Sequence, residues 1–160
     1  MRKSSTILLQ VVTVLIGVGA VAFMLWEPTI EGRNVGATLS QIYFDDPFLA
    51  CAYLASIPFF IALYQVFKLL GYIGRDEVYS LKSVKALRTI RYCAMTLVAF
   101  VVGAETYLFI FQRGKDDIAG GVFMGLLMIF AFGVVAIAAK VFEGTLQKAV
   151  DMKSENDLTV

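Results

Sequence analysis

The chain has 160 residues, of which 59% are hydrophobic and 17% charged, and its formal net charge at pH 7 is +1. This composition excludes a separate soluble catalytic domain, because such a domain needs about 50 residues or more and no polar segment is that long. With no histidine and no paired cysteine motif, we expect no metal site, no cofactor and no catalytic residue.

Four apolar runs occupy most of the chain, at about 6–26, 48–70, 92–111 and 118–139. Each is close to or above the roughly 20 residues that a helix needs to cross the hydrocarbon layer. Open strands are excluded there, because lipid offers no partner for their backbone amides. The sequence predicts one all-α membrane domain over residues 1–160, with four transmembrane helices in an antiparallel bundle, since short joints make consecutive helices neighbours.

The first run follows Arg2 and Lys3, and the small residues Ala20 and Ala22 within it imitate the end of a cleavable signal peptide. The apolar stretch nevertheless continues to Trp26, which is a length better suited to a transmembrane span. A tryptophan there also suits the membrane–water interface. We therefore interpret the run as the first span and keep the signal peptide as the alternative.

The segment 27–47 is the longest joint on the outer side and is rich in proline, glycine and acids, which is typical of an irregular loop. Its acids are Glu27, Glu31, Asp45 and Asp46. The short joint before the fourth run adds a second acidic pair, Asp116 and Asp117. A solvated surface is the simplest interpretation of these acids, and a cation or peptide sensor is the alternative.

Glu105, in the third run, is an ionisable side chain inside a predicted span. It is expected at the depth of Ser56 and Tyr53 in the second run, near Pro58, which frees a backbone carbonyl in its own helix. An intramembrane carboxyl is costly and therefore indicates a functional site, such as ion or proton coupling. The alternative is a neutral carboxyl that only joins two helices by a hydrogen bond.

Small residues in the fourth run, Gly121 and Gly125, have the spacing that lets two helices approach closely. Their partner is either another helix of the same chain or a second copy, which would make a homo-oligomer. The two cysteines, Cys51 and Cys93, fall near opposite faces of the membrane, so we expect no disulfide between them.

The polar segment 78–91 has the clearest helical pattern outside the runs. An apolar stripe repeats every three residues beside the basic residues Lys82, Lys85, Arg88 and Arg91. Ser80 is placed to cap the helix. We predict an interfacial amphipathic helix that leads into the third span. It serves either as an anchor on anionic lipid or as a docking surface for an acidic partner.

The tail, residues 143–160, continues the fourth run as an amphipathic helix and then becomes polar. We expect this helix to cover the segment 78–91, so that its acids pair with the basic residues there. The chain closes with Glu155, Asn156, Asp157, Leu158, Thr159 and Val160.

Basic residues are distributed unevenly, and their distribution predicts the topology. Eleven of the fourteen lysines and arginines lie before the first run, in or beside the joint between the second and third, or after the fourth. Only Arg33, Arg113 and Lys115 lie in the other two joints. Positive charge is retained in the cytoplasm, so both termini are expected there, in the inner membrane of a bacterium.

Two segments resemble an uncharacterised bacterial family of four-helix membrane proteins, domain of unknown function 2975. The resemblance rests on Val78-Tyr79-Ser80, on Val84-Lys85-Ala86-Leu87-Arg88 with Ile90, and on the closing Glu155-Asn156-Asp157-Leu158-Thr159-Val160. Ser83 stands where the family pattern favours asparagine. The resemblance implies a membrane partner of a small cytosolic helix-turn-helix regulator of transcription, encoded beside it, with no direct contact to nucleic acid.

Two functions follow as hypotheses. The first is a non-enzymatic regulatory or signalling protein whose cytoplasmic segments bind or sequester such a regulator. The second is a small transporter or channel subunit that uses Glu105. A membrane enzyme is not expected, because the sequence has no nucleophile elbow, no metal cluster and no phosphate-binding loop.

Overall fold

A computed structural model of the chain describes residues 3–30, 36, 38, 40, 47–112 and 118–157. They form four long helices, α1 (Lys3–Ile30), α3 (Pro47–Gly74), α4 (Leu81–Tyr107) and α5 (Ala119–Asp157), and a short π-helical segment, η2 (Leu108–Gln112), that continues α4. All four long helices are long and apolar enough to cross a membrane. The predicted all-α fold with four spans is therefore confirmed.

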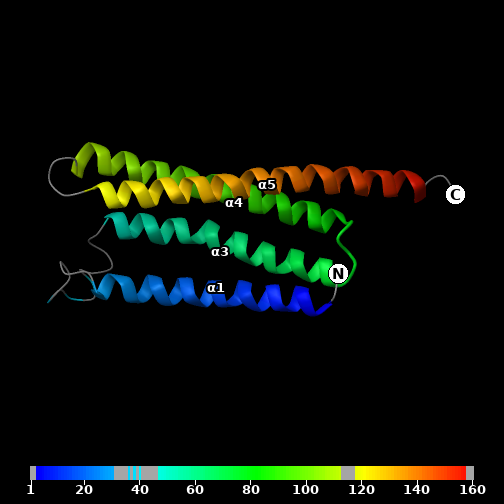
Figure 1. The fold of residues 1–160 in the computed structure, drawn as a ribbon, viewed down its shortest axis with the longest axis horizontal. Coiled ribbons are helices and arrows are strands. Elements are labelled where there is room, and N and C mark those ends of the chain that lie inside the picture. The colour runs from blue at the N-terminus through cyan, green and yellow to red at the C-terminus, as the bar shows by residue number, and fades with distance from the viewer. Residues whose placement is uncertain are drawn as a thin grey trace.

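The helices lie side by side and alternate in direction (Figure 1). The main contacts join consecutive helices, α1 with α3, α3 with α4, and α4 with α5. The start of α1, the turn between α3 and α4, and the last turns of α5 share one end of the molecule (Figure 1). We call it the basic end, because every lysine and arginine that the structure describes belongs to it.

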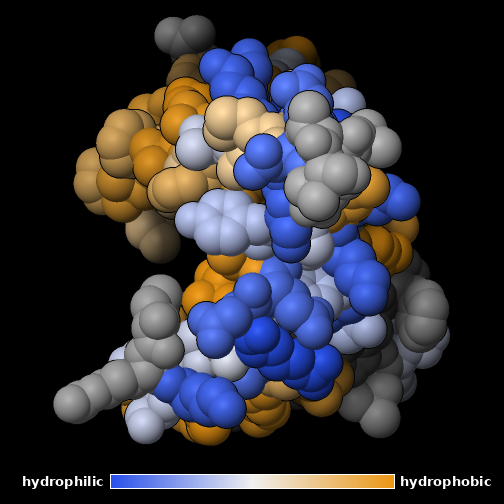
Figure 2. All heavy atoms as spheres, turned by 90° about the vertical axis from the view of Figure 1, so that its right-hand side faces the viewer, coloured by the Kyte–Doolittle hydropathy of each residue, from blue (hydrophilic) through white to orange (hydrophobic). Residues whose placement is uncertain are grey.

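The helices form a curved row and leave much of their surface open. Seen from the basic end, the molecule has a hollow along one side, and hydrophilic residues gather on the end itself (Figure 2). Most side chains of α1 and α3 are exposed or half-buried. This exposure suits helices whose outer faces contact lipid tails instead of protein.

Polar side chains and small residues join α1 to α3. The Tyr53 hydroxyl donates to the carbonyl of Met24 at 3.0 Å, and the Gln10 amide donates to the carbonyl of Phe67 at 3.2 Å. Between them, a methyl group of Leu63 lies against Gly17, 3.0 Å from the position a Cβ would take there. Small residues and interhelical hydrogen bonds are the usual means by which helices associate in lipid.

The buried core is concentrated in α4 and α5. Its apolar members are Val84, Ala86, Leu87, Ile90, Cys93, Ala94, Leu97, Ala136 and Ala139. On α4 these residues recur at the three- and four-residue spacing of one helix face. The first four turns of α4 are therefore the best-packed part of the chain that the structure describes.

The segment 78–91 differs from its prediction. Ser80 caps the helix as expected, since it has extended backbone angles and its hydroxyl accepts from the Ser83 amide at 3.4 Å. The segment is not a helix of its own, however, because α4 runs without a break from Leu81 to Tyr107. Its apolar stripe is buried at Val84, Leu87 and Ile90 and exposed only at Leu81, so protein covers most of the face that the sequence pattern assigns to the lipid interface.

The last helix, α5, has 39 residues, which at 1.5 Å per residue gives a length of about 58 Å. The hydrocarbon layer is only about 30 Å thick. The tail therefore continues the fourth span as one helix, as predicted, and α5 is longer than the apolar layer is thick. At the basic end α5 follows α4 and then runs past its start (Figure 1).

Candidate functional site

Two helix segments extend past the apolar layer at the basic end and pack on each other. We call them the terminal helix pair, and they consist of Leu81–Arg91 of α4 and Lys140–Asp157 of α5. Charged residues recur in both segments, whereas the adjoining spans are almost free of charge. The pair therefore offers both a buried interface and a charged surface close to the membrane boundary.

A buried carboxylate, Glu143, joins the two segments. Only 7% of the residue is exposed. The Nε of Arg88 donates to its Oε1 at 2.7 Å, and Nη1 of Arg91 lies 3.1 Å from its Oε2. One carboxylate thus holds two guanidinium groups, and charge-assisted contacts of this kind are stronger than neutral hydrogen bonds.

Glu143 was not singled out from the sequence, although the tail acids were expected to pair with the basic residues of 78–91. The spacing of residues in the fourth run and the tail nevertheless indicates Glu143. Ala136, Ala139 and Glu143 follow one another at helical spacing on α5, and all three are buried. An acid that continues a face of small residues is expected to point at the neighbouring helix.

The four basic residues of α4 divide into two kinds. Lys82 and Lys85 are exposed. Arg88 and Arg91 pair with Glu143, and the guanidinium of Arg91 also lies 4.8 Å from the centre of the Tyr92 ring. The hydrogen bond and opposite charge of Glu143 raise the pKa of Arg88 above its ordinary value.

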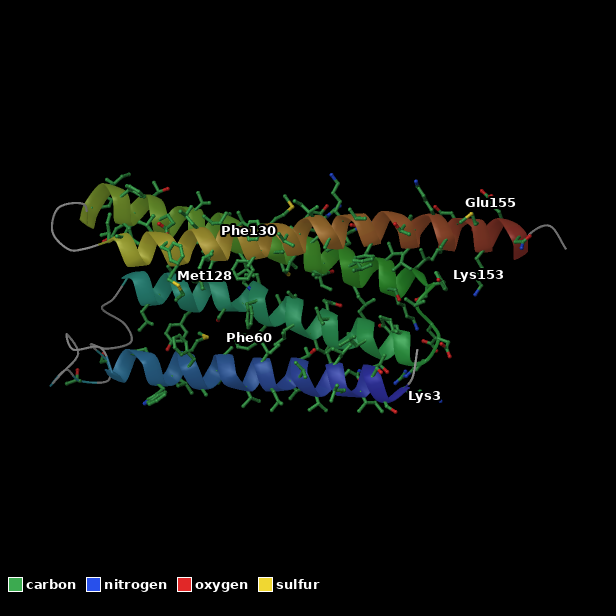
Figure 3. All side chains as sticks on the ribbon, in the orientation of Figure 1. Lys3, Phe60, Met128, Phe130, Lys153 and Glu155 are labelled. Carbon is green, nitrogen blue, oxygen red and sulfur yellow. The ribbon has the colours of Figure 1, made fainter. Side chains whose placement is uncertain are left out.

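A pocket of about 620 Å³ lies beside the terminal helix pair. It is lined by Asp76, Glu77, Tyr79, Ser80, Ala149, Met152 and Lys153. The turn between α3 and α4 supplies the first four residues, and α5 the other three (Lys153 is labelled in Figure 3). The large side chains of Tyr79 and Met152 are 59% and 64% exposed. The site therefore combines exposed apolar surface with charge of both signs.

Backbone hydrogen bonds shape the turn on which this pocket depends. The Glu77 amide donates to the carbonyl of Tyr72 at 2.9 Å, and Asp76 adopts a left-handed backbone with φ of 60°. Aspartate tolerates that conformation better than most residues. No pattern in the sequence indicates a pocket here, because the wall that α5 contributes is distant in the chain.

The tail residues of the predicted site fall partly in α5. Glu155, Asn156 and Asp157 belong to the last helical turn. Leu158, Thr159 and Val160 lie outside the described residues, as do Asp45, Asp46, Asp116 and Asp117 of the two outer joints. The structure therefore places three of the six closing residues at the end of the terminal helix pair.

The structure separates the intramembrane residues that the sequence grouped at one depth. Tyr53 bonds to α1 through Met24, and the Ser56 hydroxyl donates to the carbonyl of Tyr53 at 2.6 Å. Glu105 faces α5 instead: a Cβ added at Gly125 would overlap its carboxylate. Its Oε2 is buried without a hydrogen-bond partner in the part of the chain that the structure describes.

The helix α3 continues through Pro58 without ending. Gly121 and Gly125 of α5 lie against η2 and α4 of the same chain, since a Cβ at Gly121 would meet the Leu108 side chain at 3.5 Å and one at Gly125 would overlap the Glu105 carboxylate. Both cysteines are free, as expected. No group of three His, Cys, Asp or Glu residues among the described ones could hold a metal ion.

Comparison with known proteins gives two matches. Residues 34–160 match the family described as protein of unknown function (DUF2975). Over 161 residues the chain is also 38% identical to the uncharacterized membrane protein YoaS of Bacillus subtilis (strain 168), with both chains covered completely. The chain belongs to the DUF2975 family. No solved structure matches it.

The DUF2975 match contains α3, α4 and α5, and with them the whole terminal helix pair and its pocket. The expected resemblance is therefore confirmed. Ser83, which departs from the family pattern, is completely buried; its hydroxyl donates to the carbonyl of Glu77 at 3.5 Å and lies 3.3 Å from that of Ser80. In this member a serine thus joins the start of α4 to the pocket turn.

Proposed function

We propose that this protein is a non-enzymatic component of the bacterial cytoplasmic membrane that binds or sequesters a small helix-turn-helix regulator of transcription. In this proposal the basic end lies in the cytoplasm, because cytoplasmic segments retain lysine and arginine. The chain itself makes no contact with nucleic acid. The kind of partner comes from the family resemblance, and the binding surface is argued from the terminal helix pair.

The observation that carries the proposal is that α4 and α5 remain packed on each other through their charged segments at the basic end. A segment that only fixed topology would need exposed basic residues and nothing more. Here the same segment has a buried apolar face, an ion-paired buried carboxylate and an adjacent pocket. Such a rigid, water-facing element is suited to present a surface to a soluble protein.

The pocket has the features of a site that receives a helix. Tyr79 and Met152 provide exposed apolar surface, and Asp76 and Glu77 add acids at the edge. An amphipathic helix binds such a groove through a few apolar anchors. DNA-binding proteins carry basic residues on the surface that meets phosphate, and these residues would pair with the acids. A regulator held in this way could not bind DNA at the same time.

The experiment is capture of the product of the adjacent helix-turn-helix gene by the full-length protein in membranes. We expect the double variant Tyr79→Ala and Met152→Ala to lose capture and to change expression from the regulator's promoter. The matched control is Phe142→Ala, because Phe142 is equally exposed but outside the pocket. Unchanged capture and expression in the double variant would contradict the proposal.

A second function, a transporter or channel subunit, is favoured by one observation. The buried Oε2 of Glu105 has no partner among the described residues, although it lies within a span. Such carboxyls commonly mark ion or proton pathways. Glu105→Gln in proteoliposomes should abolish flux and its pH dependence if Glu105 carries an ion or proton. If flux is absent in both proteins, or is the same in both, this second function is wrong.

A further inference from the structure

We propose that Lys85, Arg88 and Arg91 form a binding site for the phosphate group of an anionic phospholipid, with Glu143 as the positioning residue. This inference is independent of the proposed regulator, because it concerns the membrane-proximal side of α4 and not the pocket. It rests on the exposure of Lys85 and Arg88, on the position of the three basic groups at the start of the third span, and on the geometry of Glu143.

The residues lie on one side of α4 in an order that matches the layers of a membrane. Lys85, Arg88, Tyr92 and Met95 are separated by three, four and three residues, so they share a helix face. All four are exposed, Tyr92 and Met95 by 56% and 55%. Along this face the basic residues come first, the aromatic ring second and the apolar side chain last. This order suits a lipid, because its headgroup would meet the basic residues, its interfacial region the ring and its acyl chain the apolar side chain.

The guanidinium of Arg88 has N–H donors that are available to a ligand. Its side chain is 51% exposed, and its bond to Glu143 uses Nε. No described residue accepts a hydrogen bond from its two Nη groups. A guanidinium that presents two parallel N–H groups fits a phosphate bidentately. Arg88 can therefore bind Glu143 on its inner edge and a phosphate on its outer edge.

Glu143 explains why two arginines can stay close together here. Its carboxylate is on the protein side of the cluster, with a side chain 9% exposed, and each oxygen contacts a different guanidinium. The two arginines and Glu143 together carry a net charge of +1, and Lys85 raises it to +2. The negative charge is thus buried, while Lys85 and Arg88 are exposed and can meet a lipid phosphate.

The test is native mass spectrometry of the full-length protein in detergent, titrated separately with phosphatidylglycerol, phosphatidylcholine and glycerol phosphate. We expect phosphatidylglycerol to bind at least about tenfold more tightly than phosphatidylcholine, because both lipids offer a phosphate but only choline adds a cation that the basic groups repel; a tenfold ratio corresponds to about 1.4 kcal/mol. Equal binding of the two lipids overturns the proposal. So does binding of glycerol phosphate as tight as that of phosphatidylglycerol, because the ligand would then be a free anion.

The variants Arg88→Gln and Lys85→Gln should each reduce this preference several-fold. Lys148→Gln removes an equal charge from an exposed position of α5 farther along the terminal helix pair and should leave the preference unchanged. Lys85 makes no contact that packing requires, so its variant stays informative even if Arg88→Gln folds poorly. Equal losses in Lys85→Gln and Lys148→Gln would mean diffuse attraction and no site.

The role of Glu143 is tested by whether Glu143→Gln strengthens or weakens the binding of phosphatidylglycerol. By charge alone, Glu143→Gln should strengthen binding of an anion, because it removes a negative group beside the phosphate. A positioning role predicts the opposite: the arginines lose their orientation and the preference for phosphatidylglycerol over phosphatidylcholine falls. Glu143→Asp should restore part of it. If Glu143→Gln only destabilises the protein, both lipids should bind more weakly and the ratio of their affinities should stay unchanged. That result would overturn the positioning role. Tighter binding of phosphatidylglycerol by Glu143→Gln would also overturn it.

Discussion

The two halves of the row, α1 with α3 and α4 with α5, are held together differently. In the part of the chain that the structure describes, the apolar core lies on α4 and α5, whereas the buried residues of α1 are Thr6, Thr13 and Pro28. The α1–α3 contact depends on glycines and single hydrogen bonds. The α4–α5 contact combines a packed core with a buried ion pair.

This difference follows from the surroundings of each contact. Within lipid, apolar burial between helices contributes little, because the tails are as apolar as the side chains. Beyond the lipid, the hydrophobic effect operates, and burying an aliphatic side chain stabilises by about 1.5–3 kcal/mol. In the proposed topology the terminal helix pair lies in water, so α4 and α5 gain a stabilisation there that is not available to α1 and α3.

The largest expected effect comes from Glu143→Ala. It leaves Arg91, whose side chain is only 21% exposed, without its carboxylate. Breaking a buried pair costs about 3 kcal/mol or more, and the exposed head of Arg88 adds little because water solvates it. We expect a fall of about this size in the free energy of unfolding, measured by titration with sodium dodecyl sulfate in mixed micelles.

The control for Glu143→Ala is Glu155→Ala, which removes the same charge from an exposed position near the end of α5. Its effect should be much smaller. If the two variants unfold at the same detergent fraction, the ion pair does not hold the terminal helix pair together. The α4–α5 contact would then differ from the α1–α3 contact only in its apolar packing.

The second effect concerns α4 and α5 inside the membrane. Gly125→Ala places a methyl group on the Glu105 carboxylate, whereas Gly133→Ala meets nothing within 4 Å. Overpacking costs about 1–3 kcal/mol, so we expect Gly125→Ala to lower the thermal midpoint of the purified protein. Gly133→Ala should leave it unchanged or raise it slightly, because alanine favours helix over glycine.

The double variant Gly125→Ala and Glu105→Ala tests whether the Glu105 carboxylate is the group that the new methyl group meets. Removal of the carboxyl opens the space that the new methyl group needs, so the double variant should be more stable than Gly125→Ala alone. If Gly125→Ala and Gly133→Ala have the same midpoint, close packing at Gly125 is not what joins α4 to α5.

Much of this architecture could be predicted, because its signals are local. Hydropathy located the four spans, and the position of Ser80 before a periodic segment identified the cap of α4. The surroundings of the segment 78–91 could not be predicted in the same way. An apolar stripe beside a basic one fits either a lipid surface or a partner helix, and the length of α5 decides between them.

The candidate sites depended even more on helix rotation, which no single helix reveals. Glu105 was assigned to α3 by depth alone, but it faces Gly125 of α5. Glu143 meets Arg88 and Arg91 because two helices far apart in the sequence share a register. The pocket requires the same register, since Met152 of α5 closes it opposite Tyr79.

The smallest expected effect concerns the contact between α1 and α3, which is the weaker of the two halves. Tyr53→Phe removes one hydrogen bond, from the hydroxyl to the carbonyl of Met24, and keeps the ring. Interhelical hydrogen bonds in membranes contribute about 0.6 kcal/mol on average, so the fall in the free energy of unfolding should be near that value. Thr106→Val is the control, because the Thr106 hydroxyl bonds only within its own helix, to Val102. A loss for Tyr53→Phe as large as that for Glu143→Ala would mean that α1 is fixed to α3 as firmly as α4 to α5, and the contrast between the two halves would then be wrong.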